Sequence, residues 1–362
     1  MQPLRLAVVG CGAAARSCHL TALPHVPQIR LTALIDPDPE QARAALRWYT
    51  DQGGSAEDVV IARSVEEAAD AFDAAVVAVP HTAHAAVAGD LLARGKHVLL
   101  EKPMATSAAD AEALAAAAAA APDTHLVMAH PRRLFPANAW VRGLIQDGGL
   151  GTVTRVRWTE GHPYSWEPVS WSMFDRRLAG GGVLTDTASH VFDILLWWLG
   201  PDVEVVDYVD DSLGGVEADA VATLRIGGVE TVLELSRVRA LGISCVVTGT
   251  EAEVSVGTDF PAGECTLITA SGEELHRGDV RAVPPAQDEW DDLFVEQLRN
   301  FAAVCSGADV APHATAEDGL RVARLIEQCY TGPARRPLAQ PWLTGTTLTG
   351  TTLTGTTSRS VA

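Results

Sequence analysis

LAVVGCGAAA, residues 6–15, is the stretch that decides the fold of this 362-residue chain. Its apolar run ends at Gly10, and Gly12 and Ala15 follow at the spacing of a turn that joins a strand to a dinucleotide-binding helix. Glycines permit the tight turn and let a pyrophosphate approach backbone N–H groups, and a small third residue lets helix and strand pack closely. We therefore expect the phosphates of a dinucleotide to bind at Gly10, Gly12, Ala13, Ala14 and Ala15.

A carboxylate follows this loop at the end of the next predicted strand. Asp36 ends the apolar run 29–36, and Pro37 comes directly after it. A carboxylate in this place accepts hydrogen bonds from both adenosine ribose hydroxyls and repels a 2′-phosphate, and the proline supplies no cation to offset that repulsion. Asp36 therefore predicts NAD rather than NADP as the cofactor.

The sequence around the loop indicates a parallel sheet. Apolar runs that look like strands buried on both faces lie at residues 4–10, 29–36, 74–80, 97–101 and 126–129. Helical patterns separate them, among them the alanine-rich stretch 113–121, which Pro122 ends. Such strands alternating with helices are typical of βαβ units. We predict a dinucleotide-binding α/β domain over residues 1–125.

After about residue 150 the pattern changes to consecutive strands. Strand-like segments separated by Gly and Asp lie at residues 152–160, 203–210, 218–226, 230–237, 243–249 and 265–270. Short connections between them favour a large antiparallel sheet. Helical patterns accompany it at residues 186–199, 288–305 and 315–330. We predict an α+β domain over residues 126–340, followed by a disordered tail over 341–362, where the uncharged unit LTGTT is repeated three times.

The composition argues against several classes of partner. Asp and Glu outnumber Lys and Arg 46 to 27, and this acidic balance disfavours a nucleic-acid or anionic-membrane surface. The most apolar late stretch, 191–199, is short and contains Asp193, so it is not expected to span a bilayer. The six cysteines lack CxxC spacing. The run 4–10 already has the pattern of a buried strand, so we expect no signal peptide before it. We expect a reduced, cytoplasmic protein.

Two polar side chains late in the chain have the spacing of a catalytic helix face. Asp186 and His190 are spaced i, i+4, so one helical turn would place both on the same side. Oxidation of a secondary alcohol by a nicotinamide needs a base for the hydroxyl proton, and histidine titrates near neutrality. We expect His190 to take or give this proton, and Asp186 to orient the ring and favour its cationic form. The alternative is that Asp186 only caps the helix and His190 is a half-buried structural histidine.

Motifs along the whole chain except its tail resemble the glucose–fructose oxidoreductase/inositol dehydrogenase (Gfo/Idh/MocA) family. They are the phosphate loop, VPxxxH at 79–84, GKHVLLEKP at 95–103, RRxxP at 132–136 and GGGVLTDTASH at 180–190. The resemblance implies a Rossmann domain followed by an open-faced antiparallel sheet, through which the subunits form homodimers or homotetramers. It also implies NAD-dependent oxidation or reduction of carbinols in sugars and inositols.

The resemblance assigns further site residues. Lys102 is expected beside the cofactor, where it reaches the substrate hydroxyl and either relays the proton or stabilises the oxyanion. The other expected cofactor contacts are Pro80, His84 and Glu101, and Arg132 and His130 are expected in the substrate pocket with Asp186 and His190. The chain departs from the family pattern at Ala188, where glycine is usual, and at His130, where asparagine or an aromatic residue is common. Both departures could reshape the pocket.

Residues 159–181 form a loop-like stretch with aromatic and acidic side chains. Trp166 and Trp171 offer flat faces for a sugar ring, or alternatively pack the loop itself. Between residues 157 and 219, acidic side chains outnumber basic ones 12 to 3. This excess would suit an amino sugar or aminocyclitol, although exposed acidic runs are commonly just solvated.

Two other functions stay open at this level. A nicotinamide-binding regulator without turnover would share the fold, but the joint presence of Lys102, Asp186 and His190 counts against it. An NAD-dependent glycosidase would begin with the same hydride removal, and nothing in the residues excludes it. His81 and His84 have the spacing of a metal pair, but no cysteine or carboxylate cluster accompanies them, so we expect no metal.

Overall fold

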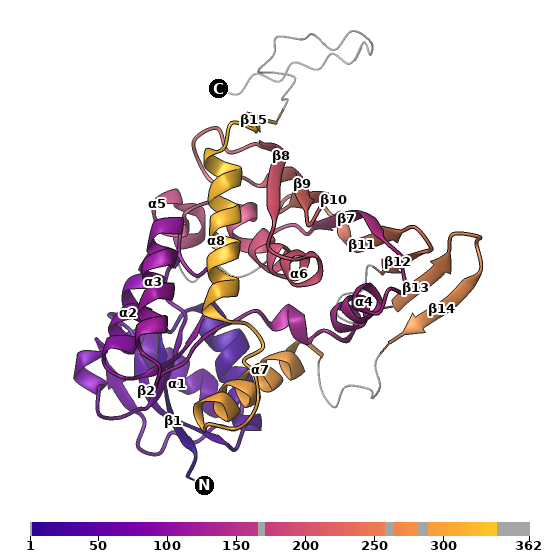
Figure 1. Cartoon of the computed structure of the whole chain (residues 1–362). Coiled ribbons are helices and arrows are strands. Elements are labelled where there is room, and N and C mark those ends of the chain that lie inside the picture. The colour runs from indigo at the N-terminus through magenta and orange to yellow at the C-terminus, as the bar shows by residue number, and fades with distance from the viewer. Residues whose placement is uncertain (1, 166–170, 258–263, 281–288, 339–362) are drawn as a thin grey trace, which may run out of the picture.

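Two β-sheets, one in each half of the chain, organise the structure (Figure 1). It is a computed structural model that describes residues 2–165, 171–257, 264–280 and 289–338. The first sheet is entirely parallel and the second is largely antiparallel. The predicted fold class, an α/β domain followed by an α+β domain, is confirmed.

The first sheet is a doubly wound sheet built around the phosphate loop. Its strands are β1 (Leu4–Val9), β2 (Ile29–Ile35), β3 (Val60–Ala62), β4 (Ala74–Val77), β5 (His97–Leu100) and β6 (Leu126–Met128). They stand in the order β3-β2-β1-β4-β5-β6. The order reverses between β1 and β4, and sheets of this type bind ligands at the carboxyl ends of the strands beside that reversal.

Three α-helices connect these strands, α1 (Pro39–Asp51), α2 (His84–Ala93) and α3 (Ala108–Ala120), and a π-helix, η1 (Ala15–Leu20), follows the phosphate loop. Side-chain caps fix where two of them begin. The Asp38 carboxylate accepts the backbone N–H of Glu40 at the start of α1, and the Ser107 hydroxyl accepts that of Asp110 at the start of α3. Each cap satisfies a backbone donor that a helix leaves without a partner at its N-terminus.

A segment from late in the chain completes the core of the first domain. Helix α7 (Glu289–Cys305) buries Phe294, Leu298 and Phe301 in the same cluster as Leu6 and Leu31 of the first sheet. Figure 1 shows this helix, in orange, beside the N-terminal strands. Strand β6 also belongs to the first sheet. A boundary at residue 125 therefore leaves out β6 and α7, because their apolar side chains find partners in the first domain.

The second sheet has nine described strands. They are β7 (Val153–Gly161), β8 (Val203–Asp210), β9 (Asp219–Ile226), β10 (Val229–Ser236), β11 (Gly242–Gly249), β12 (Ala252–Val256), β13 (Glu264–Thr269), β14 (Glu274–Asp279) and β15 (Arg335–Pro337). Their order is β14-β13-β12-β11-β7-β10-β9-β8-β15, and only the β7–β10 and β8–β15 pairs are parallel. The sequence pattern does not predict β12, β14 and β15, because these strands are short or bury few apolar side chains.

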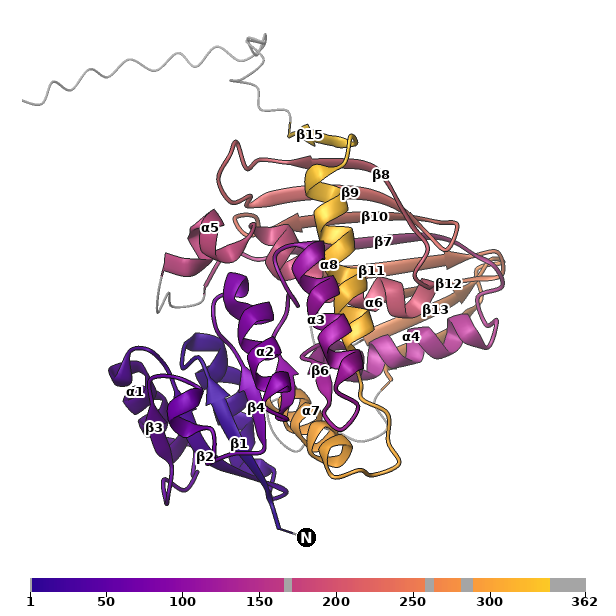
Figure 2. The same cartoon turned by 60° about the vertical axis from the view of Figure 1, so that its left-hand side comes forward.

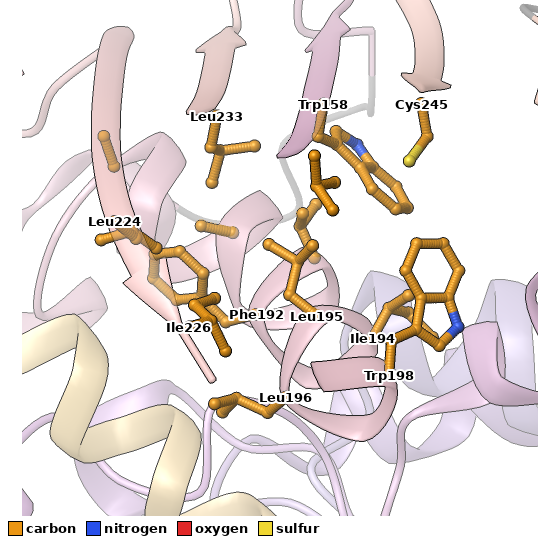
Figure 3. Close-up of a cluster of buried hydrophobic side chains, with 14 of the residues drawn as sticks. Trp158, Phe192, Ile194, Leu195, Leu196, Trp198, Leu224, Ile226, Leu233 and Cys245 are labelled. Carbon is orange, nitrogen blue, oxygen red and sulfur yellow. The ribbon is translucent and has the colours of Figure 1, made fainter. Parts of the chain in front are cut away.

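Helices α4 (Pro136–Gln146), α6 (Ser189–Leu199) and α8 (Ala316–Thr331) lie on one face of this sheet (Figure 2). Figure 3 shows Phe192 and Trp198 of α6 directed toward the sheet residues Leu224, Leu233 and Trp158. Neighbouring positions on a strand point to opposite faces. The alternate residues of β10, such as Val232, are accordingly only half-buried on the other face.

None of the described helices combines the length and apolar character needed to cross a bilayer. None of the six cysteines, all of them within the described residues, is joined in a disulfide. Burial raises the pKa of Cys11, inside the phosphate loop, to about 12, so this thiol stays protonated at neutral pH.

Candidate functional site

A cavity of about 1430 Å³ lies at the carboxyl ends of the first sheet and extends to the turn that precedes α6. The loops after β1, β2, β4 and β5 line one part of it, and residues 160, 164, 186, 187 and 190 line the other. Its volume exceeds the range of about 300–1,000 Å³ that is common for small-molecule sites. The cavity therefore has room for a dinucleotide and a second ligand next to it.

The phosphate loop has the backbone that its sequence predicts. Gly10 has φ +87°, and a Cβ atom there would lie 2.4 Å from the Ala78 carbonyl oxygen, so only glycine fits. A Cβ atom at Gly12 would meet nothing within 4 Å, which leaves this side of the loop open for a phosphate. Ala13 and Ala14 also line the cavity. Ala15 is buried in the core, so it packs the helix against the strand and does not face the ligand.

Asp36 stands at the end of β2 and lines the same cavity. Its carboxylate accepts the backbone N–H of Cys11 at 3.0 Å and that of Asp38 at 2.9 Å, which ties the acid to the phosphate loop. Arg63, just after β3, lines this end of the cavity as well. The residues next to Asp36 in the sequence do not reveal this cation, because Arg63 comes close to Asp36 only through the pairing of β3 with β2.

Glu101 and three histidines surround the wall that carries Lys102. The Glu101 carboxylate contacts His19 Nε2 at 2.8 Å and accepts the Lys102 backbone N–H at 3.2 Å. Although burial raises the pKa of Glu101, His19 and Lys102 hold it below its ordinary value. His84 lies between the carbonyl oxygens of residues 79 and 103, and His81 Nδ1 contacts that of residue 179. Both histidines therefore contact backbone carbonyls on this wall of the cavity.

Lys102 and Asp186 meet in the cavity although they come from different domains. The Lys102 ammonium donates to Asp186 Oδ1 at 2.5 Å and to the Asp186 backbone carbonyl at 3.2 Å. Arg237, directly after β10, donates from Nη2 to Asp186 Oδ2 at 2.7 Å. Burial would raise the pKa of Asp186, but Lys102 and Arg237 hold it far below its ordinary value, so Asp186 is a carboxylate at neutral pH.

The backbone before Asp186 is held by a buried acid. Asp186 lies in a π-helical turn, η7 (Leu184–Ala188), that leads into α6. Glu217 Oε1 accepts the N–H groups of Gly182 and Leu184, both at 2.9 Å, and the Tyr330 hydroxyl at 2.6 Å. A Cβ atom at Gly182 would lie 2.0 Å from the Glu217 carbonyl oxygen. Glycine at position 182 is thus needed for this close approach.

His190 also lines the cavity. Its Nδ1 is buried and has no hydrogen-bond partner among the described residues. Burial, together with Lys102 and Arg132, holds the pKa of His190 well below its ordinary value of 6.5. The imidazole is therefore neutral at physiological pH. The expectation that Asp186 orients the ring and favours its cationic form does not match this geometry, because both carboxylate oxygens are bound by Lys102 and Arg237.

Arg132 lines the cavity as expected, in a bidentate ion pair with Glu160 at 2.7 and 2.8 Å. His130 differs from the prediction: it is 1% exposed and does not line the cavity. Its ring lies edge-on to His190 with 6.4 Å between the ring centroids, and its Nε2 is 3.9 Å from Asp193 Oδ1. The correction has a physical cause, because η5 (Pro131–Leu134) turns the chain so that Arg132 takes the cavity side.

The aromatic loop is only partly described. Trp166 lies outside the described residues, and so does the side chain of Trp171. Tyr164, Met173 and Leu178 from the same stretch line the cavity. Tyr164 is one of the aromatic residues that the sequence of this loop offers for a sugar ring. Arg237 belongs to no motif, and its place depends on how β10 lies in the second sheet.

The acidic excess between residues 157 and 219 is largely neutralised by arginines outside that window. Ion pairs join Asp193 to Arg133, Asp207 to Arg336, Asp210 to Arg335 and Asp219 to Arg239. Among the described acidic residues of the window, only Glu160 and Asp186 line the cavity, and both are paired with cations. The charge count along the sequence therefore does not describe the charge of the cavity wall, where both carboxylates face cations.

Comparison with known proteins places this geometry in context. Residues 4–130 match the family described as "Oxidoreductase family, NAD-binding Rossmann fold", and residues 139–255 match the "GFO/IDH/MocA C-terminal domain". A myo-inositol dehydrogenase of Streptomyces leeuwenhoekii is 30% identical, over 91% of this chain and 98% of that protein. A putative UDP-kanosamine synthase oxidoreductase subunit of Amycolatopsis mediterranei is 35% identical, and the match spans about half of each protein, 55% of this chain and 52% of the relative. Among solved structures, an oxidoreductase domain protein from Kribbella flavida has a TM-score of 0.77 and 25% identity, with 91% of this chain and 97% of that chain covered.

Proposed function

The chain belongs to the Gfo/Idh/MocA family of NAD-binding oxidoreductases, and we propose that it transfers a hydride between nicotinamide and a secondary alcohol or ketone of a sugar or cyclitol. The observation that carries the proposal is the meeting of Lys102, Asp186 and His190 in one cavity that continues to the phosphate loop and Asp36. A protein that only bound the dinucleotide would have no need of a buried proton acceptor at this place.

The residues present fit a dinucleotide. The open face of Gly12, the N–H groups of residues 12–14 and the Asp36 carboxylate would hold its phosphates and adenosine ribose. Pro80 and Glu101 would border its nicotinamide half. When bound, NAD supplies the hydride acceptor at the nicotinamide ring.

His190 is the proton acceptor in this proposal. A neutral, cavity-lining imidazole can take the proton of a substrate hydroxyl, whereas Asp186, held ionised by two cations, is too weak a base for this role. Lys102 has three ammonium donors, and the carboxylate and the carbonyl of Asp186 accept two of them. The third would stabilise the negative charge that develops on the substrate oxygen.

A coupled assay tests the proposal. Wild-type protein is screened with sugars, inositols and amino sugars for NADH formation, and the ketone and any released leaving group are quantified. Lys102→Ala and His190→Ala should each lower kcat by about 100-fold or more, the range for a lost proton-transfer or oxyanion group. Lys96→Ala is the matched control, because Lys96 bonds the Phe72 carbonyl at 2.8 Å outside the cavity. Unchanged rates in both site variants would refute the assignment, and leaving-group release without net NADH would identify a glycosidase instead.

The substrate we propose is an uncharged polyol ring. Three cations and two carboxylates surround the proton-transfer position: Lys102, Arg132, Arg237, Asp186 and Glu160. Each of the two carboxylates is paired with at least one of these cations, so neither is left for a substrate ammonium group. Tyr164 offers a ring face, and the polar groups offer hydrogen bonds to hydroxyls. Matched pairs such as inositol with an aminodeoxyinositol, or glucose with glucosamine, should show higher kcat/KM for the neutral member. A preference for the amino member would contradict this part of the proposal.

We also propose that the chain forms homodimers or homotetramers through the face of the second sheet opposite α6. Val221, Val232 and Val246 are half-buried side chains of β9, β10 and β11 on this face, and a second copy would cover them. Light scattering measures the mass in solution. Val232→Glu should lower it, whereas Val310→Glu, at a site 47% exposed in the loop before α8, should not. A monomeric wild type would refute the proposal.

A further inference from the structure

Arg237 is a charged residue next to the site that does not line the cavity. Its guanidinium bonds Asp186 Oδ2 at 2.7 Å, and its side chain is 8% exposed. We infer that Arg237 is a positioning residue for hydride transfer: it takes one oxygen of Asp186 and thereby aims the other at Lys102. This inference rests on the proposed function and assigns a part of its machinery that does not touch the substrate.

The backbone at Arg237 is fixed on both sides. Its N–H donates to the Ala218 carbonyl at 2.8 Å, and its carbonyl accepts the Tyr164 N–H at 2.8 Å. The guanidinium also lies 5.8 Å from the centre of the Tyr164 ring. The second sheet therefore sets the place of this cation, and a fixed cation can hold a carboxylate in one orientation.

The charges that face Asp186 explain what the second cation does. Lys102 and Arg237 each bind one carboxylate oxygen, and His81 lies close enough to act electrostatically. If Lys102 were the only partner, the carboxylate would neutralise its charge and could rotate toward His190. With Arg237 sharing the carboxylate, Lys102 keeps part of its positive charge for the substrate oxygen, and His190 stays free of a carboxylate partner.

Substitution at Arg237 with a neighbouring control tests this role. Arg239 lies two positions further along, is 44% exposed and pairs with Asp219 and Glu234 on the surface. Arg237→Gln should lower kcat by about 10- to 100-fold, as expected for an outer partner of a site residue. Its Kd for NADH should match that of Arg239→Gln, whereas its Tm should be lower, because the substitution removes one partner of a buried ion pair. Free guanidinium added to Arg237→Ala should restore part of the rate, but not in Lys102→Ala.

A measurement without turnover separates this inference from the proposed function. The Asp186 carboxyl resonance, assigned with Asp186→Asn, is followed by ¹³C NMR against pH in the wild type and in Arg237→Gln. Over the pH range in which both proteins stay folded, the resonance should begin to move toward its protonated position at higher pH in the variant, because one of two stabilising cations is gone. The same onset in both proteins, or a kcat for Arg237→Gln equal to that of Arg239→Gln, would overturn the inference. An earlier onset in a protein that oxidises none of the screened alcohols would keep Arg237 as the anchor of Asp186 and refute the proposed function alone.

Discussion

His190 is the residue whose surroundings set the expected pH dependence of the reaction. Burial, Lys102 and Arg132 hold its pKa well below 6.5, so the ring is neutral from about pH 6.5 to 8 and ready to accept a proton. We expect kcat/KM for alcohol oxidation to show no loss from His190 protonation in this range, and to fall only at lower pH, where the free enzyme's imidazole becomes protonated. A pH–rate profile measures this. An acid limb centred at or above 6.5 would contradict the assigned environment.

Asp36 is the residue that should decide between NAD and NADP. Its carboxylate is held against the phosphate loop by Cys11 and would repel a 2′-phosphate, even though Arg63 lines the same end of the cavity. We expect higher kcat/KM with NAD than with NADP. Asp36→Ala should lower the ratio of kcat/KM with NAD to kcat/KM with NADP by about 10-fold, which corresponds to about 1.4 kcal/mol. Asp51→Ala, at an exposed position at the end of α1 that does not line the cavity, is the control. A ratio unchanged by Asp36→Ala would show that Arg63 or the loop sets the preference.

At the level of residues, the sequence predicts the members of the site that belong to motifs. Lys102, Asp186 and His190 could be named because their spacing and order carry a recognisable pattern. The second cation that binds the Asp186 carboxylate could not be named from the sequence. It is Arg237, which reaches Asp186 only because of the position of β10 in the second sheet. His130 was expected in the pocket from its place in the family pattern, but the turn η5 that follows it brings Arg132 to the cavity and leaves His130 buried away from it.

At the level of elements, the close packing of the backbone before η7 predicts that Gly182 tolerates no side chain. A Cβ atom at Gly182 would lie 2.0 Å from a backbone oxygen, so Gly182→Ala should force the turn to move, lower kcat and cost about 1–3 kcal/mol of unfolding free energy. Gly89, inside α2, is the matched control, because a Cβ atom there meets nothing within 4 Å. Gly89→Ala should instead stabilise the protein by up to about 1 kcal/mol. Urea unfolding and kcat measure both variants; equal effects would show that the close approach at Gly182 is unimportant.

Strands with a strong apolar pattern could be predicted, and strands defined mainly by their neighbours could not. The central strands β9, β10 and β11 alternate buried and partly exposed residues, which is the pattern that the sequence shows. By contrast, β14 has no buried residue and β15 has three residues, so backbone pairing with β13 and β8 defines them. The π-helical turn at 184–188 was also missed, since it continues smoothly into α6 and shares its apolar pattern.

At the level of the whole molecule, buried neutral histidines predict a loss of stability in mild acid. Burial lowers the pKa of His81 to about 4 and that of His313 to about 3, whereas in the unfolded chain each is near 6.5. Below 6.5 the unfolded chain binds protons that the folded protein does not, so unfolding becomes easier as the pH falls toward those values. The stabilisation is fully present above pH 6.5, and each histidine should remove about 1.4 kcal/mol per pH unit below it. Urea unfolding at several pH values checks this, and a slope that His313→Asn leaves unchanged would contradict it.

Helix α7 has a consequence for how the molecule can be made or divided. Because Phe294, Leu298 and Phe301 fill the core around β1 and β2, the cofactor-binding half cannot close until nearly the whole polypeptide has left the ribosome. For the same reason, a fragment that ends after β6 would expose the apolar surface that α7 covers, and it should aggregate when expressed alone. The nucleotide-binding domain therefore cannot be transferred to another enzyme as the N-terminal segment alone, and a fusion protein would have to include α7.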